Sequence, residues 1–160
     1  MNRRRVIASV AASAAAMLIG RATMAQQPKQ ENGIRKHRYW TMLLIEVDFV
    51  NNTSGVAARV AEELRADLRR TAERLSVRTL RGIRVVDFDI SERLRLRAGS
   101  KRSYGGHILT ELNMVDDSDG AAENVMKHLG EELQAAVQNF SRRTVRGSRV
   151  VFIHSGEIKA

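Results

Sequence analysis

The chain of 160 residues contains no cysteine, which excludes disulfide bonds, zinc–thiolate sites and thiol chemistry. It also lacks a G-x-S-x-G nucleophile motif, a phosphate-binding loop and a dinucleotide-binding fingerprint. These absences favour a protein without catalytic activity and without a cofactor. Hydrophobic residues make up 43% of the chain, and this length and composition suit one packed domain rather than two.

The first 25 residues have the three-part layout of an export signal. A basic start, "MNRRR", precedes "VIASVAASAAAMLIG", an apolar run too short to span a bilayer comfortably, and small residues at "TMA" suit cleavage near Ala25. The order from Asn2 to Ile7, with Arg3 and Arg4 as the pair, resembles a bacterial twin-arginine signal. That resemblance implies export of the folded protein to the periplasm, with no transmembrane segment in the mature chain. An uncleaved, membrane-anchoring N-terminus is the alternative.

Cleavage would change the charge balance of the protein. Four of the 27 basic residues and none of the 18 acidic residues leave with the signal, so the mature charge is 23 − 18, or +5. Outside the cytoplasm, a moderate positive charge points to acidic partners or envelope surfaces and away from nucleic acid. A cytoplasmic nucleic-acid binder would follow only if the signal were false. Residues 26–38 hold the only proline and no apolar pattern, so they predict a flexible linker.

The rest of the chain, 39–160, contains an internal repeat. Residues 39–90 align with 104–155 at a spacing of 65 without a gap, and 17 of the 52 positions are identical, against about three to five expected from composition. Each copy predicts a strand, an amphipathic helix and a second strand. In the first copy, the alternation along the second strand places Val86, Phe88 and Ile90 on one face. We therefore predict a single α+β domain, a ferredoxin-like βαββαβ sandwich with four antiparallel strands and both helices on one face.

The first repeat also resembles known envelope domains. The segments "LLIEVDFVNNTSG", "VAEELRADL" and "RVVDFD" are similar to the opening of the N-terminal domains of TolB-like and CsgG-like proteins, which implies an accessory role in the cell envelope. Duplicated βαβ units are also found in the tautomerase superfamily, whose catalysis needs an N-terminal proline on the first strand. Pro28 lies in the predicted linker, so that activity is not supported.

The sharpest motif is the doubled "RTLRGIRVV" and "RTVRGSRVV", at 78–86 and 143–151. Guanidinium groups beside a glycine turn could bind anions. Alternatively, the arginines complement the carboxyl end of each helix while the glycine supplies the turn. In the predicted topology the two motifs lie at opposite ends of the sheet, so they would form two separate sites. The candidate anion-binding residues are Arg78, Arg81, Arg84, Arg143, Arg146 and Arg149.

Polar residues on the predicted strands suggest a second candidate site. Strand parity directs Glu46, Asp48, His107 and His154 away from the helices. The last strand should flank the first, which would bring His154 beside Glu46 and Asp48, with His107 near. Two imidazoles and two carboxylates could bind a divalent metal there, whereas the alternative is a solvated or oligomer-facing sheet. The sequence therefore favours a small exported binding or assembly module that binds an envelope protein or itself. The alternative is a metal-dependent or anion-processing periplasmic enzyme.

Overall fold

The computed structural model describes residues 35–94, 99–115 and 118–159. The predicted export signal and residues 26–34 of the predicted linker lie outside the described residues. Within the described part the elements follow the order strand, helix, strand, strand, helix, strand. They are β1 (Arg35–Phe49), α2 (Ser54–Glu73), β2 (Leu80–Leu94), β3 (Lys101–Met114), α3 (Ala121–Gln138) and β4 (Val145–Glu157).

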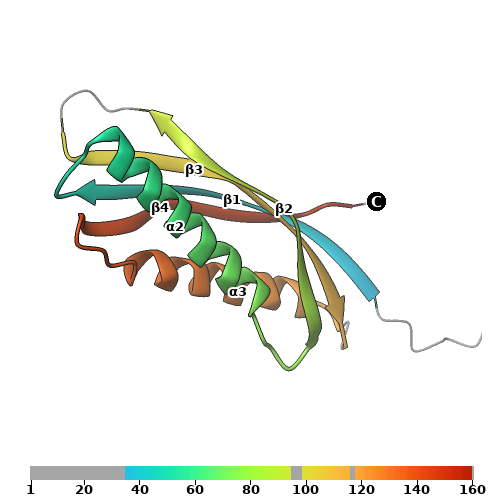
Figure 1. The fold of residues 1–160 in the computed structure, drawn as a ribbon. Coiled ribbons are helices and arrows are strands. Elements are labelled where there is room, and N and C mark those ends of the chain that lie inside the picture. Colours follow the sequence, from blue (N-terminus) through green and yellow to red (C-terminus); the bar gives the residue numbers. More distant parts are fainter. Residues whose placement is uncertain (1–34, 95–98, 116–117, 160) are drawn as a thin grey trace, which may run out of the picture. The chain divides into compact units, whose positions relative to one another are not determined.

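The four strands form one antiparallel sheet in the order β2-β3-β1-β4. Both helices lie on the same side of this sheet (Figure 1), and the opposite side is not covered by any described element. The predicted α+β class, the βαββαβ order and the antiparallel sheet are therefore confirmed. The arrangement is compatible with the predicted ferredoxin-like sandwich.

The core lies between the sheet and the helices. The odd-numbered positions of β1 from Tyr39 to Phe49 are buried, as the alternation predicts. The helical stripes are confirmed as well, because Leu64 and Leu68 of α2 and Leu129 and Leu133 of α3 are almost fully buried. Burying each of these leucine side chains stabilises the fold by about 1.5–3 kcal/mol.

The predicted boundary between linker and domain is wrong, because β1 begins at Arg35 rather than near Tyr39. Residues 35–38 pair with Glu111–Met114 at the end of β3. Lys36 and Arg38 both contact Glu111, at 3.6 and 3.4 Å. Charged residues at a strand end carry no apolar alternation, so this extension depends on pairing with a distant strand and leaves no local signal.

The repeated arginine motif forms the first half of both edge strands and contains two β-bulges in each. The register shifts at Arg81 and Val86 in β2, and at the equivalent residues Arg146 and Val151 in β4. Each bulge inserts one residue and reverses the side-chain parity beyond it. The prediction that Val86 shares the core face with Phe88 and Ile90 is therefore wrong. Val85 packs against the core instead, and Val86 is 44% exposed.

Contacts between side chains also repeat at the 65-residue spacing. Two kinds of ion pair occur in both halves of the described domain. They are Lys101–Glu46 (3.3 Å) with its equivalent Lys36–Glu111 (3.6 Å), and Arg102–Glu92 (3.0 Å) with its equivalent His37–Glu157 (2.9 Å). The sheet therefore has an approximate two-fold axis between β1 and β3, and each position on one half has a counterpart on the other.

We expect the contact between β2 and β3 to tolerate no side chain at Gly106. A Cβ atom there would lie 1.8 Å from the carbonyl oxygen of Asp89, whereas a Cβ at Gly105 would meet side-chain atoms of Arg93 and Leu44 at 3.1 and 3.2 Å. Overpacking against backbone cannot relax by a rotamer change, so Gly106→Ala should lower the free energy of unfolding by about 3 kcal/mol. Urea denaturation measures this, with Gly105→Ala as the matched control. Equal effects of the two substitutions would contradict the prediction.

Candidate functional site

The uncovered face of the sheet, called the open face below, has an ion-paired cluster towards each end. In one cluster Glu46 contacts Lys101 at 3.3 Å and Arg149 at 3.0 Å. In the other, Glu111 contacts Lys36 and Arg38 and is only 8% exposed. The two acids are therefore neutralised by neighbouring cations. Both ends of the open face therefore carry charges that are compensated by ion pairs.

The centre of the open face is an apolar hollow of about 650 Å³, called the groove below. Its walls include Trp40, Met42 and Leu44 of β1 and Phe152 of β4. Met42 is 51% exposed and Phe152 is 49% exposed, which is unusual for such large apolar side chains. Gly105 of β3 also lines the groove, and its missing side chain contributes to the space.

An aromatic cluster occupies the side of the groove next to β4. The Trp40 indole lies over Gly156, where a Cβ atom would be 2.6 Å from the ring. The His154 imidazole meets Trp40 edge-on at a centroid distance of 5.3 Å and lies 6.3 Å from Phe152. Aromatic pairs at these distances are stabilising and hold the rings in defined positions. The cluster thus forms a rigid apolar platform.

On the opposite side, Arg93 of β2 lines the groove, and β2 carries two acidic residues outside this lining. Asp87 and Asp89 are exposed there, and Asp87 lies 2.9 Å from the Nε2 atom of His107. The hydrogen bond with His107, helped by the backbone N–H of Phe88, holds the pKa of the Asp87 carboxyl below its usual 3.8. Asp87 is therefore an anion under all physiological conditions. The groove therefore has an aromatic wall on one side and Arg93 with His107 on the other, and Asp87 and Asp89 lie outside its lining.

The four candidate metal ligands do not come together. In the register, His107 and His154 lie on opposite sides of Met42, so β1 separates them. Glu46 is paired with Arg149, and Asp48 accepts a hydrogen bond from Ser100. β4 does flank β1 as expected, but the predicted position of His154 beside Glu46 and Asp48 is wrong. Among the described residues, no three His, Asp or Glu side chains are grouped as a metal site.

The six motif arginines are all exposed and belong to two distant places. They lie at or just before the starts of β2 and β4, which are the two edge strands and run in opposite directions. The two clusters therefore lie at opposite ends of the sheet and cannot form one pocket. Arg149 is already paired with Glu46. Binding of anions by either cluster stays a prediction.

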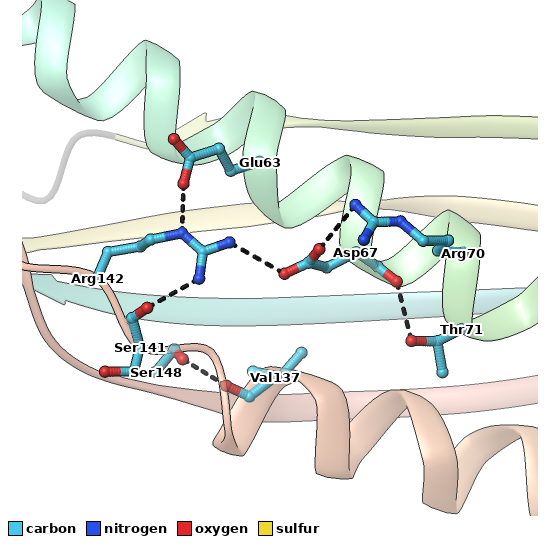
Figure 2. Close-up of polar contacts among 8 residues, drawn as sticks. All are labelled: Glu63, Asp67, Arg70, Thr71, Val137, Ser141, Arg142 and Ser148. Atoms are coloured by element: carbon cyan, nitrogen blue, oxygen red, sulfur yellow. Dashed lines mark hydrogen bonds and ion pairs between the residues drawn. The ribbon is translucent and has the colours of Figure 1, made fainter.

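A neighbouring arginine outside the candidate set, Arg142, makes the densest polar contacts of this region. Figure 2 shows its guanidinium group reaching from the turn between α3 and β4 to α2. It donates hydrogen bonds to Glu63 and, at 3.2 Å, to Asp67, and it lies 4.5 Å above the Phe140 ring. The hydrogen bond to Glu63 is the largest cause that raises the pKa of Arg142. Arg142 therefore links the turn after α3 to α2, and its guanidinium group is engaged in that contact.

Comparison with protein-family models and with curated proteins finds no match to this chain. In the part of the chain that the structure describes, no helix is long and apolar enough to cross a membrane. The chemistry of the open face is therefore what bears on function.

The His107–Asp87 pair predicts a measurable pH effect. Because the folded-state pKa of Asp87 is below 3.8, its ionised form stabilises the fold above that pH, and this contribution is lost as the pH falls through the lower folded value. In a ¹³C NMR titration of side-chain carboxyl groups, His107→Ala should raise the pKa of Asp87. His128→Ala on α3 serves as the control and should leave it unchanged. An Asp87 pKa that is the same in the His107 variant would contradict the assignment.

Proposed function

We propose that this protein is an exported, non-catalytic binding or assembly module of ferredoxin-like fold. In this proposal it binds another protein of the bacterial envelope through the groove on its open face. The strand order β2-β3-β1-β4, with the two helices on one side, supports the ferredoxin-like class. The resemblance of residues 1–25 to a twin-arginine signal supports export, and the likeness of the first repeat to envelope domains supports an accessory role there.

The observation that carries the binding role is the half-exposed apolar cluster in the groove. Trp40, Met42 and Phe152 together leave a contiguous apolar surface in water, which proteins normally avoid unless another molecule covers it. Ion-paired charges lie at both ends of this surface. An apolar centre with a polar rim and a partly exposed tryptophan is the usual composition of a protein-binding surface.

The charges around the groove indicate what kind of surface would bind. On the β2 side Arg93 lines the groove, while Asp87 and Asp89 are exposed on the same strand outside its lining, and Asp87 is held in its ionised form by His107. A partner with apolar side chains for the aromatic wall, an acidic side chain for Arg93 and a basic side chain for Asp87 beside the groove would complement this surface. Complementary charge would set orientation and association rate, while burial of the apolar centre would supply the affinity.

An enzyme that uses the polar residues of this face is the alternative. It would need titratable side chains that converge on one substrate position. Within the described residues, His107 and His154 are separated by β1, and Glu46 is held by two cations. The geometry therefore favours binding over catalysis.

Export can be tested at the N-terminus of the chain. Changing both Arg3 and Arg4 to lysine should retain the full-length protein in the cytoplasm, because twin-arginine recognition requires the arginine pair. Arg5→Lys, outside the pair, is the matched control and should be exported normally. Cell fractionation and mass spectrometry of the N-terminus measure the outcome, with Gln26 expected as the first residue of the exported form. Cytoplasmic wild-type protein that keeps Met1 would contradict export.

The groove can be tested with a charge placed at its centre. Met42→Asp should weaken capture of an envelope partner about 30-fold or more, because a buried carboxylate opposes an apolar contact. Val115→Asp changes an equally apolar residue that is 68% exposed but lies outside the groove, so it should bind like the wild type. Quantitative cross-linking in the periplasm followed by titration of the purified partner measures this. A partner that binds both variants equally would exclude the groove as the binding surface.

A further inference from the structure

Arg93 is the only arginine or lysine among the described residues that line the groove, and no aspartate or glutamate is among them. Its Nε atom donates a hydrogen bond to the Gly105 carbonyl oxygen at 3.1 Å. Its stem lies over Gly105, where a Cβ atom would be 3.1 Å from the Arg93 Cγ. The side chain is therefore held against β3, with its guanidinium group exposed beside the groove.

A β-bulge directs Arg93 towards this position. The register of β2 on β3 shifts between Glu92 and Leu94, which makes Arg93 the extra residue of the bulge. Bulges often redirect a side chain next to a functional site. The two other bulges of β2 recur in β4, whereas this one has no counterpart there. The placement of Arg93 thus depends on a feature that the duplicated fold itself does not require.

The terminal nitrogens of Arg93 are not engaged by the described part of the protein. Within those residues the Arg93 side chain forms no ion pair, and its single hydrogen bond comes from Nε. The adjacent acid, Glu92, is held by Arg102 at 3.0 Å. Asp89 lies four residues away on the same strand, a separation of about 13 Å. The guanidinium group can therefore bind an anion from outside the chain.

An apolar row crosses the sheet from Arg93. Gly105 lies opposite Leu44 in the pairing of β1 with β3, and Leu44 lies opposite Phe152 in the pairing of β1 with β4. Arg93 and Phe152 belong to the two edge strands, which are three strand spacings or about 14 Å apart. Met42 continues the apolar surface along β1. The row therefore has a charged end and an aromatic end.

We propose that the groove binds a small apolar molecule that carries a single carboxylate group, of which a fatty acid is the simplest form. The carboxylate accepts hydrogen bonds from the two terminal nitrogens of Arg93, and the apolar body lies over Leu44 towards Phe152. A planar guanidinium group matches a carboxylate in this bidentate way. A hollow of about 650 Å³ with a mainly apolar lining and one charged group has the composition of a small-molecule site.

The charges around the groove select a ligand with one negative charge. Among the described residues that line it, only Arg93 is permanently positive. Asp87 and Asp89 are exposed on the same edge strand outside the lining, and they repel a second negative charge on the ligand. Phosphate esters and nucleic acids therefore fit this site less well than a carboxylate.

This inference goes beyond the proposed function and does not rest on it. The ligand and the proposed protein partner use the same groove, so they exclude each other. Ligand binding is measured on the purified protein alone, whereas partner capture is measured in the periplasm. Ligand binding without partner capture would contradict only the proposed function. Partner capture without ligand binding would contradict only the present inference.

Trp40 provides the measurement, because it is the only tryptophan of the chain and it lines the groove. Dodecanoate, kept below its micelle concentration, should change the fluorescence of protein purified from cells expressing the full chain, and the change should saturate at one site per chain. Dodecanol lacks the charge and should bind about tenfold more weakly or worse. The absence of saturable binding of dodecanoate, or equal binding of dodecanol, would overturn the proposal.

The carboxylate position is tested by substitution of Arg93. Arg93→Gln should raise the dissociation constant of dodecanoate about tenfold or more and leave that of dodecanol unchanged. Arg93→Lys keeps the charge without the planar fork and should be intermediate. Arg59→Gln, at an exposed position of α2 on the helix side, is the matched control and should bind like the wild type. A folded Arg93→Gln variant with normal dodecanoate binding would exclude Arg93 as the carboxylate site.

The orientation of the ligand is tested without any substitution. Bromine quenches tryptophan fluorescence at short range, and the Trp40 ring lies towards β4, over Gly156. ω-Bromododecanoate carries its bromine at the end that lies towards Phe152, so it should quench Trp40 more strongly than α-bromododecanoate, whose bromine lies beside Arg93. Equal quenching by the two ligands, or stronger quenching by the α-bromo form, would contradict the proposed orientation.

Discussion

The antiparallel pairing of β1 with β3 is the contact on which the rest of the domain depends. It runs from Arg35 to Asp48 on β1 and joins the first strands of the two repeats. Each helix leaves one of these central strands, crosses the same face of the sheet and returns the chain along an outer edge. The close contact that allows β2 to pair with β3 at Gly106 then fixes the position of the other edge. Because the central pair joins equivalent strands, everything outside it occurs twice.

Much of this fold could be predicted because its signals are local. The alternation in β1 and the apolar stripes of the helices appear in the sequence as periods of two and about 3.6 residues, and the structure buries those residues. The extension of β1 to Arg35 could not be predicted, since it depends on ion pairs with Glu111 at a sequence distance of more than seventy residues. The bulges at Val86 and Val151 could not be predicted either, because the sequence does not indicate which of two adjacent valines faces the core.

The candidate site was predicted less well for the same physical reason. Strand parity correctly directs His107 and His154 away from the helices, yet which residues meet across strands depends on register, and each bulge shifts that register. The sequence does carry a signal for the groove. Residues 40–45, "WTMLLI", are almost continuously apolar, a pattern typical of a strand covered on both faces. Arg142 had no signal, because its counterpart in the first repeat is Val77.

An internal duplication offers a comparison within one molecule, since the two halves of the sheet meet the same structural requirements. Positions that stay alike, such as the ion pairs of Glu46 and Glu111, serve the fold in both halves. Positions on the open face that differ between the two halves are not required by the fold, so we infer that they serve binding. The principal differences on the open face are Trp40 with Gly105, Met42 with His107, Phe152 with Asp87 and His154 with Asp89. In each pair the larger apolar or aromatic residue lies on the side of β1 and β4. The divergence therefore runs in one direction and concentrates an apolar surface on one half of the open face, where stability of the isolated domain does not require it.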